Sequence, residues 1–277
     1  MIPVVKWLGG KRGMLKELKE IITPELLEGN TYYEVFAGGA ALALDLEHKD
    51  TVLNDLNSEL INMYTVIRDN PEELIKLLKE HQEKHCEDWF YFIRGLDKSG
   101  DLDYLTAECK AARTIYLNKT CFNGLYRVNK KGFFNSPIGK TSSGKMPDIV
   151  QEDNIRELSK FLKTVTLCNE DFESIAKKAT KGSVLFFDPP YDTDEDIKTD
   201  GFVGYQKEGW TREDTKRLKA TCDELVNRGC KVVITNNDTE FVRELFKDYI
   251  IKEVEVKRSI NRDGNKRKGK EVIITNE

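Results

Sequence analysis

Residues 184–191 join an apolar run to a short group that could bind an amine. Val184 to Phe187 are four large apolar residues, and the sequence Asp188-Pro189-Pro190-Tyr191 follows them. Such a run, bounded by glycine and proline, is typical of a strand buried on both faces in a parallel sheet. In open α/β sheets, ligands bind beyond the carboxyl ends of the strands. Asp188 is therefore expected at a ligand-binding edge.

The chemistry of the Asp188–Tyr191 group suits a planar amine. Two prolines remove two N–H donors and keep a helix from continuing, so the carbonyls of Asp188 and Pro189 face outward. Tyr191 adds a rigid ring beside these acceptors, and a flipped nucleobase requires both acceptors and a stacking face. Taken alone, the four residues fit an ordinary strand-ending turn equally well.

A second group has the pattern of a nucleoside site. Residues 32–36 are expected to form a strand, and the small-residue turn Ala37–Ala40 follows it. Glycines at such a turn make room for a nucleoside cofactor, although the turn is not GxGxxG. Asp55 ends the next strand and could accept both ribose hydroxyls, or it could cap the helix that follows. Near the start, Trp7 and Lys11 offer a stacking face and a cation around two glycines.

Composition limits the class of protein. The 277 residues are 39% hydrophobic and 33% charged, which predicts one large globular domain or a domain with an insertion. No apolar run reaches the roughly 18 residues of a membrane span, so a cytoplasmic protein is expected. Six cysteines without a CxxC pair favour free thiols. His81 and His85 lack any companion ligand, so we expect a solvated helix face and no metal site.

Charge is unevenly distributed along a chain whose net charge is −4. Residues 109–147 carry eight basic and no acidic side chains, and residues 257–270 carry seven basic side chains and one acidic side chain. Two such segments on an acidic protein favour a defined track for a polyanion over solvated loops.

The alternation of strands and helices is interrupted in the middle of the chain. Between residues 58 and 147 we expect helices over about 71–84 and 105–118, with a loop at 120–137 rich in aromatics, amides and cations. These side-chain types suit the reading of a DNA groove. We therefore expect a catalytic domain from residues 1–57 and 148–277, with a target-reading domain at 58–147. The catalytic part should contain seven strands, the last two antiparallel.

The ordered set KWLGGK, EVFAGGA, ND, TCFNGLYRVN, NEDF, DPPY, ITNND, RSIN and EVIITN resembles the DNA adenine methyltransferase (Dam) family. The matches extend from Lys6 to Asn276. The resemblance implies an α/β fold with a Rossmann-like seven-stranded methyltransferase sheet and an inserted, mostly helical target-recognition domain. It also implies S-adenosyl-L-methionine as donor and N6-methyladenine in double-stranded DNA as product.

Site residues follow from the resemblance position by position. The cofactor contacts match Trp7, Lys11, Phe36, Gly38, Gly39, Asp55, Asp171, Phe172, Asp188 and Phe202, although FAGGA departs from the family's more usual F-x-G-x-G. The amine and base pocket matches Asp188, Pro189, Pro190 and Tyr191. The DNA contacts match Lys6, Phe122, Asn123, Leu125, Arg127, Asn129 and Pro137. Of these, Phe122 and Asn123 match residues that enter the base stack, and Lys6, Leu125, Arg127 and Pro137 match readers of GATC.

The implied mechanism is alignment of donor and amine. Asp188 and the Pro189 carbonyl would accept the two amine hydrogens and so localise the lone pair of the amine. The alternatives are an amino-methyltransferase acting on cytosine, RNA or protein glutamine, and a silent DNA-binding or NAD-using Rossmann protein. The resemblance is compatible with a cognate restriction endonuclease as a partner and with a monomer or weak dimer.

Overall fold

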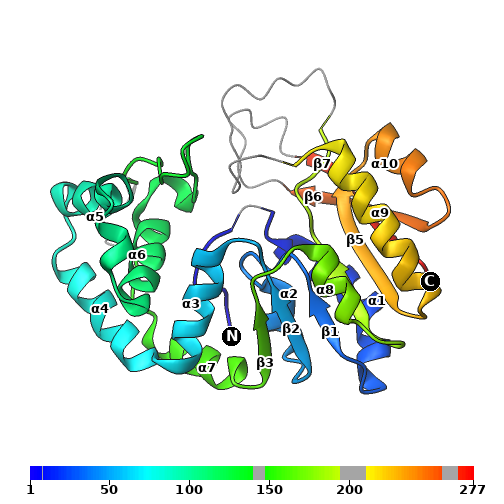
Figure 1. Ribbon diagram of the computed structural model, residues 1–277, viewed down its shortest axis with the longest axis horizontal. Helices are drawn as coiled ribbons and strands as arrows, with labels where there is room; N and C mark the ends of the chain where they lie inside the picture. Colours follow the sequence, from blue (N-terminus) through cyan, green and yellow to red (C-terminus); the bar gives the residue numbers. More distant parts are fainter. Residues whose placement is uncertain (8, 140–146, 194–209, 258–267) are drawn as a thin grey trace.

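The structure is a computed structural model that describes residues 1–7, 9–139, 147–193, 210–257 and 268–277. The described strands form one seven-stranded sheet in the order β3-β2-β1-β4-β5-β7-β6 (Figure 1). Their bounds are β1 (Tyr32–Glu34), β2 (Thr51–Asn54), β3 (Val165–Cys168), β4 (Val184–Phe187), β5 (Lys231–Asn237), β6 (Ile250–Lys257) and β7 (Lys268–Thr275). The first five strands are parallel, and β7 is antiparallel to both β5 and β6. The expected seven strands and the final antiparallel pair are confirmed.

The strand order reverses between β1 and β4. From β1 the chain continues to β2 and β3 on one side, whereas β4 and β5 extend the sheet on the other. Ligands in open α/β sheets bind at such a switch point. The carboxyl ends of β1 and β4 therefore mark the place where a site is expected, and Phe36 and Asp188 follow these two strands.

Helices cover both faces of the sheet. All four residues of β4 are buried, as their uniform hydrophobicity predicts for a central strand. Leu185 and Phe187 pack with α8 (Phe172–Lys178), α9 (Arg212–Asn227) and α10 (Glu240–Leu245), while Val184 and Phe186 join the core containing α1 (Leu15–Leu27) and α2 (Ala41–Leu46). Thr211 and Asp214 form a capping box at the start of α9. The cap of α10 is Thr239, whose side chain accepts from Val242 N.

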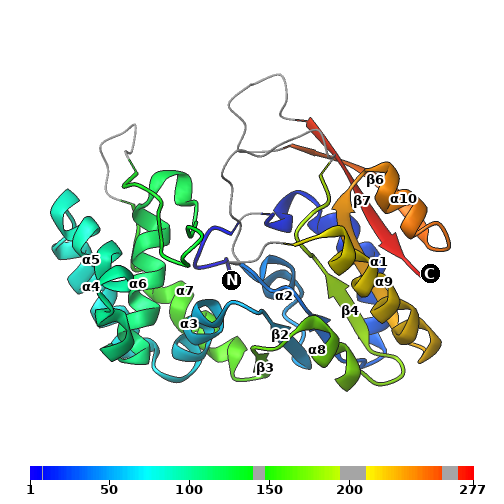
Figure 2. The same ribbon diagram turned by 45° about the horizontal axis from the view of Figure 1, so that its top comes forward.

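The middle of the chain forms a helical group beside the β3 edge, far from β6 and β7 (Figures 1 and 2). It contains α3 (Ser58–Asp69), α4 (Pro71–Glu83), α5 (Glu87–Ser99) and α6 (Ala107–Thr120), and α7 (Glu152–Leu162) packs against α3. Short 3-10 turns lie at Lys11–Gly13, Asp101–Tyr104 and Phe122–Gly124. Helices α4 and α6 confirm the sequence prediction. Helix α5 was not among the expected helices, and its run Trp89–Phe92 places four aromatic residues in a row.

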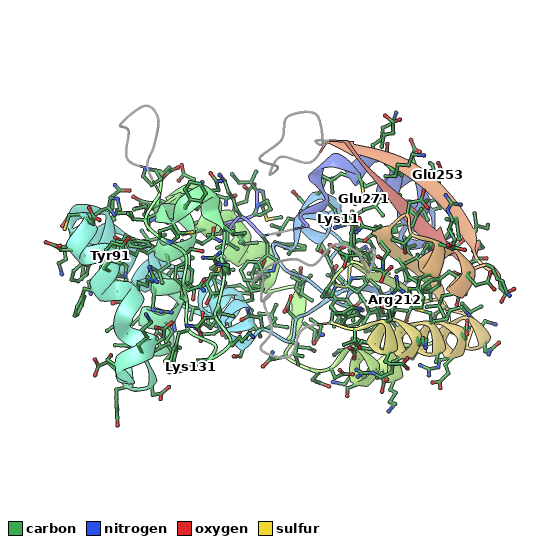
Figure 3. All side chains as sticks on the ribbon, turned by 90° about the horizontal axis from the view of Figure 1, so that it is seen from above. Lys11, Tyr91, Lys131, Arg212, Glu253 and Glu271 are labelled. Carbon is green, nitrogen blue, oxygen red and sulfur yellow. The ribbon has the colours of Figure 1, made fainter. Side chains whose placement is uncertain are left out.

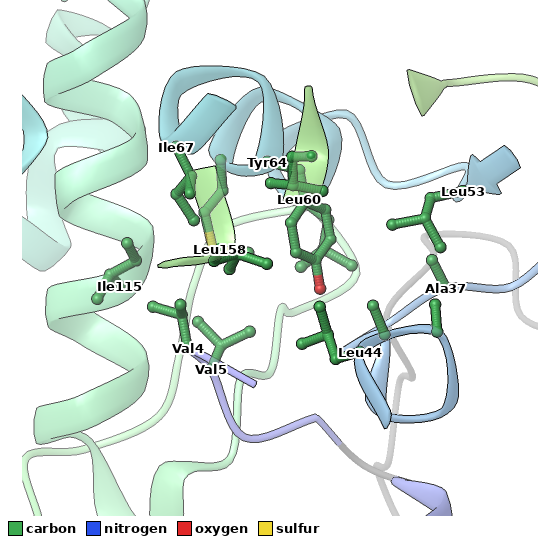
Figure 4. Close-up of a cluster of buried hydrophobic side chains, with 14 of the residues drawn as sticks. Val4, Val5, Ala37, Leu44, Leu53, Leu60, Tyr64, Ile67, Ile115 and Leu158 are labelled. Carbon is green, nitrogen blue, oxygen red and sulfur yellow. The ribbon is translucent and has the colours of Figure 1, made fainter. Parts of the chain in front are cut away.

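The N-terminal segment joins the helical group to the sheet. Val4 and Val5 are buried, and they lie between α3, α6 and the β1–α2 region (Figure 4). The same hydrophobic cluster contains Leu44, Leu53, Leu60, Tyr64, Ile115 and Leu158. Trp7 and Lys11 follow this anchored segment, so their approach to the sheet edge is set by packing that begins at Val4.

Two minor expectations have different outcomes. All six cysteines are free thiols, as expected. The expectation that His81 lies on a solvated helix face is wrong. Its ring stacks on Tyr116 at 4.8 Å, and its Nδ1 accepts a hydrogen bond from Trp89 Nε1 at 3.2 Å. Burial lowers the pKa of His81 to about 4, so the ring stays neutral at pH 7. Among the helices that the structure describes, none has the length and apolar character to cross a membrane.

Candidate active site

Asp188 lies directly after β4 and is held by two donors. The ammonium Nζ of Lys11 is 2.7 Å from Asp188 Oδ1, and Thr235 Oγ1 donates to the same oxygen at 2.7 Å. Lys11 Nζ also donates to the carbonyl of Gly9. The Lys11 side chain is only 6% exposed, and that of Asp188 is 17% exposed, so this ion pair is shielded from water. Shielding strengthens the attraction between the two charges.

Tyr191 is oriented by contacts on its face and at its hydroxyl. Lys11 Nζ lies 4.8 Å from the centroid of the ring, and the Tyr191 hydroxyl donates to Glu271 Oε2 at 3.0 Å. Burial, with the carboxylates of Asp188 and Glu271, raises the pKa of Tyr191 well above its ordinary value, so the phenol remains a donor. Figure 3 shows Lys11 and Glu271 near each other, although they come from opposite ends of the chain.

The Lys11 ammonium makes the contacts expected for a bound amine at this place. It donates to a carboxylate oxygen and lies over the ring of Tyr191. The sequence placed Lys11 in a cofactor cradle, whereas the structure brings it against Asp188. The carboxylate and the ring thus form a binding place for a nitrogen that carries hydrogens.

The glycine turn after β1 accommodates Trp7. A Cβ atom on Gly38 would lie 2.7 Å from Trp7 Cδ1, and Gly38 has a φ of +47°. Gly38 N donates to Asp55 Oδ2 at 2.9 Å, and Asn57 N donates to Asp55 Oδ1 at 2.8 Å. Asn57, not Asp55, caps α3. Burial raises the pKa of Asp55. The structure therefore joins Trp7, Gly38 and Asp55 in one continuous set of contacts.

An aromatic cluster lines the other side of the switch point. The Phe36 ring centroid is 5.9 Å from that of Phe172 and 5.6 Å from that of Trp210. Asp171 caps α8 by accepting from Glu173 N at 3.0 Å, and its Oδ2 is 2.7 Å from Arg217 Nη2. Phe202, the other aromatic expected here, lies outside the described residues.

The predicted reading loop is closed by short β-bridges. Cys121 pairs with Ile138, Val128 pairs with Phe134, and Phe122 N donates to the Pro137 carbonyl at 2.9 Å. Phe122 is 54% exposed, which is unusual for a large apolar side chain in a folded protein. Asn123 follows with a φ of +58°. A residue that wedges into a base stack must be exposed in this way.

The polar side chains of this loop bond to the loop itself. Arg127 Nε donates to Asn135 Oδ1 at 2.6 Å, and Asn129 Oδ1 accepts from Lys131 N at 2.8 Å. The Leu125 carbonyl accepts from the Ser136 hydroxyl. These bonds fix the backbone on which Leu125 and Arg127 are displayed. Asn129 thus has a structural role within the loop, beside any contact with DNA.

Lys6 and Trp7 connect the loop to the sheet. Asn118 bonds to both backbone groups of Lys6, with Lys6 N donating to Oδ1 at 2.8 Å and Nδ2 donating to Lys6 O at 2.8 Å. A Cβ on Gly124 would lie 2.8 Å from Lys6 Cδ, so the Lys6 side chain lies against the loop. Trp7 stacks on Tyr126 at 5.2 Å, and the Tyr126 hydroxyl donates to Glu59.

The basic segment at 109–147 is not uniformly available to a polyanion. Arg113 is 2% exposed and pairs with Asp97 at 3.0 Å, so it stabilises the helical group. Lys130 and Lys131 are exposed. Lys140 and Lys145, and most of the segment 257–270, lie outside the described residues.

Residues 7–260 match the family model described as D12 class N6 adenine-specific DNA methyltransferase. The chain belongs to this family. It is 37% identical over 277 residues to the type II methyltransferase M1.LlaDCHI of Lactococcus lactis subsp. cremoris, covering 99% of this chain and 95% of the relative. It is 36% identical to the type II methyltransferase M.MjaIII of Methanocaldococcus jannaschii, covering 96% and 95%. It is 30% identical to the DNA adenine methylase of Escherichia coli, covering 95% and 91%.

Membership establishes that this methyltransferase acts on adenine in DNA and requires a methyl donor. Sequence reasoning missed Glu34, Trp210, Thr235 and Glu271 of the candidate site. Glu34 is buried in β1 and accepts from Ala43 N at 2.7 Å and from the Tyr32 hydroxyl at 3.1 Å. Its position inside an apolar strand was the available signal. Trp210 completes the aromatic cluster, but no local pattern indicated this contact.

Proposed function

We propose that this methyltransferase transfers the methyl group of S-adenosyl-L-methionine to the N6 amine of an adenine flipped out of duplex DNA, within GATC. The observation that carries this proposal is the environment of the Lys11 ammonium. It lies 2.7 Å from Asp188 Oδ1 and 4.8 Å from the Tyr191 ring centroid, which is the environment that an adenine amine would require.

The chemistry of the side chains at the switch point fits S-adenosyl-L-methionine. Asp55 offers carboxylate oxygens to ribose hydroxyls, and Asp171 can accept from an adenine amine. Phe36 and Phe172, with ring centroids 5.9 Å apart, supply apolar surface for the adenine ring. When bound, this donor supplies an electrophilic methyl group. Trp7, Lys11, Gly38, Gly39, Asp188 and Phe202 are the remaining proposed contacts.

The chain's own residues align the target amine. Asp188 and the Pro189 carbonyl accept its two hydrogens, so its lone pair is no longer delocalised into the ring and points toward the methyl group. Tyr191 stacks on the base, and Pro190 keeps the segment extended. Pro189 is buried and Asp188 is shielded from water, so both acceptors are held in place before the base arrives.

We propose that residues 58–147 recognise the target and that residues 1–57 and 148–277 carry out catalysis. Lys6, Leu125, Arg127 and Pro137 would read GATC, and Phe122 and Asn123 would fill the space of the flipped adenine. Lys6 belongs to the catalytic part by sequence, and its contact with Gly124 supports its role as a reader, because the contact brings its side chain against the loop. The exposure of Phe122 supports its role as a wedge.

Methylation-sensitive sequencing of DNA from cells that express the chain tests the proposal. We expect N6-methyladenine at GATC and nowhere else. Methylation of adenine in another sequence would refute the recognition site alone. Labelled methyl transfer to a duplex of G·C pairs only, to RNA and to protein should give only background signal. Membership of an adenine-specific family argues against these alternative substrates.

We further propose a cytoplasmic monomer or weak dimer that works beside a cognate restriction endonuclease. Two relatives bear the name type II methyltransferase, which supports such a partner. DNA from expressing cells should resist a nuclease that cuts unmethylated GATC. Sedimentation of the purified chain at increasing concentration tests the oligomeric state.

A further inference from the structure

Two buried side chains outside the DPPY sequence bond to its two functional groups. Thr235 Oγ1 donates to Asp188 Oδ1 at 2.7 Å, and Glu271 Oε2 accepts from the Tyr191 hydroxyl at 3.0 Å. Thr235 is 0% exposed and Glu271 is 9% exposed. Burying a hydroxyl and a carboxylate is costly unless they are bonded, so each needs a partner at this place.

These side chains belong to neighbouring strands of the sheet. Thr235 of β5 is paired with Ile273 of β7. Two residues further along β5, Asn237 is paired with Glu271 of β7. Strand β5 is also paired with β4, where Phe187 lies opposite Ile234 immediately before Asp188. Thr235 and Glu271 therefore lie within one hydrogen-bond ladder, and Asp188 directly follows the last β4 residue of that ladder. Side chains on such strands are located more accurately than side chains on loops.

The same strand end also fixes the residue after Tyr191. Asp192 N donates to Asn236 Oδ1 at 2.9 Å, and Asp192 Oδ2 accepts from Thr239 Oγ1 at 2.7 Å. Arg212 Nε pairs with Asp192 Oδ1 at 2.9 Å. Both ends of the segment from Asp188 to Asp192 are thus attached to the carboxyl end of β5. What remains adjustable is the plane of the Asp188 carboxylate and the direction of the Tyr191 side chain.

Both are rotational freedoms that a single contact leaves loosely defined. The terminal torsion of an aspartate side chain is broad, and a tyrosine side chain can rotate about χ1, so a second bond is needed to hold each in place. Lys11 is the other partner of Asp188, but it has a long flexible stem. Thr235, in contrast, is β-branched and holds its hydroxyl in a narrow range.

We propose that Thr235 and Glu271 are positioning residues for methyl transfer: Thr235 fixes the carboxylate plane of Asp188, and Glu271 fixes the direction of the Tyr191 side chain. This inference rests on the proposed roles of Asp188 and Tyr191. Thr235 and Glu271 would touch neither substrate nor cofactor. They would act through Asp188 and Tyr191, which do. Misalignment should therefore slow the transfer step and leave binding intact.

The test compares Thr235→Val with Thr235→Ser. Valine has the shape of threonine without the hydroxyl, whereas serine keeps it. We expect the single-turnover rate constant to fall about tenfold in Thr235→Val, since a bond to a charged group is lost, and to recover to within about threefold in Thr235→Ser. Dissociation constants for duplex and for S-adenosyl-L-methionine should change less than about twofold. Thr166→Val, at an exposed position of β3, is the matched control and should keep the wild-type single-turnover rate constant.

Glu271 is tested with Glu271→Leu and Glu271→Gln. Glutamine keeps an acceptor for Tyr191 and should retain more than half of the wild-type rate constant, whereas leucine should lower it about fivefold, as for loss of one hydrogen bond. In a Tyr191→Phe background the two Glu271 variants should be equally fast, because no hydroxyl remains to be held.

Several outcomes would overturn the inference. It fails if Thr235→Ser is as slow as Thr235→Val, or if weaker binding of duplex or donor accounts for the lower rate constant. It also fails if adding Glu271→Leu lowers the rate constant of Tyr191→Phe further. Failure of the proposed function looks different. In that case wild type itself gives no N6-methyladenine, or Asp188→Ala keeps its activity.

Discussion

Gly38→Ala is a sharp test of the turn between β1 and α2, because the neighbouring glycine supplies its control. The new Cβ would lie 2.7 Å from Trp7 Cδ1, at a backbone φ of +47°. Left-handed backbone costs an L-residue about 1–2 kcal/mol, and overpacking costs about 1–3 kcal/mol, so we expect a loss of roughly 2–5 kcal/mol. At Gly39 the nearest atom would be Trp7 Cβ at 3.5 Å, which is ordinary contact. Gly39→Ala should therefore change stability by less than about 1 kcal/mol.

Urea unfolding followed by tryptophan fluorescence measures this difference. The free energy of unfolding should fall in Gly38→Ala with an unchanged slope against urea, because the change acts on the native state. Displacement of Trp7 should also weaken binding of S-adenosyl-L-methionine and disturb the stack on Tyr126. Calorimetric titration with the donor tests this second expectation. A free energy of unfolding for Gly38→Ala within about 1 kcal/mol of that of Gly39→Ala would refute the role given to Gly38.

Three further predictions concern other parts of the molecule. Arg113→Met should lower the free energy of unfolding by about 3–5 kcal/mol in urea, because it leaves the buried carboxylate of Asp97 unpaired. Burial raises the pKa of Glu34 from 4.5 to about 8, so its contribution to stability is full below pH 4.5 and is lost as the pH rises through 8. Glu34→Gln should abolish this decline in the free energy of unfolding, measured by urea titrations between pH 5 and 8. An unchanged pH dependence in the variant would contradict the role given to Glu34. Phe122→Ala should reduce the fluorescence of 2-aminopurine placed at the target position, with little change in protein stability, since Phe122 is 54% exposed.

Regular elements were predictable where one local period dominates. The apolar run before Asp188 indicated β4, and the helix expected over about 71–84 is α4. Helix α5 was missed because four adjacent aromatics conceal the helical period. In the folded chain only Phe90 of these four is buried with Ile93 and Leu96, while Tyr91 and Phe92 are exposed.

The residues of the site were predictable by type and less so by contact. Asp188 and Tyr191 could be placed at a strand end from sequence. The bond between Lys11 and Asp188 could not, because it depends on how the N-terminal segment packs across a sheet whose strand order is not encoded locally. Thr235 and Glu271 were hidden for the same reason. Their approach follows from the pairing of β5 with β7, which sequence spacing does not define.

Single-turnover methylation by Asp188→Ala tests the central claim most directly. The assay uses labelled S-adenosyl-L-methionine and a duplex with one GATC site, beside binding of the same duplex. Because loss of a preorganised acceptor costs on the order of a hundredfold, we predict that transfer becomes undetectable or falls by at least that factor. Binding of the duplex should remain within about twofold of wild type. A variant that keeps more than about a tenth of the wild-type rate constant would contradict the assignment of Asp188 as the acceptor of the adenine amine.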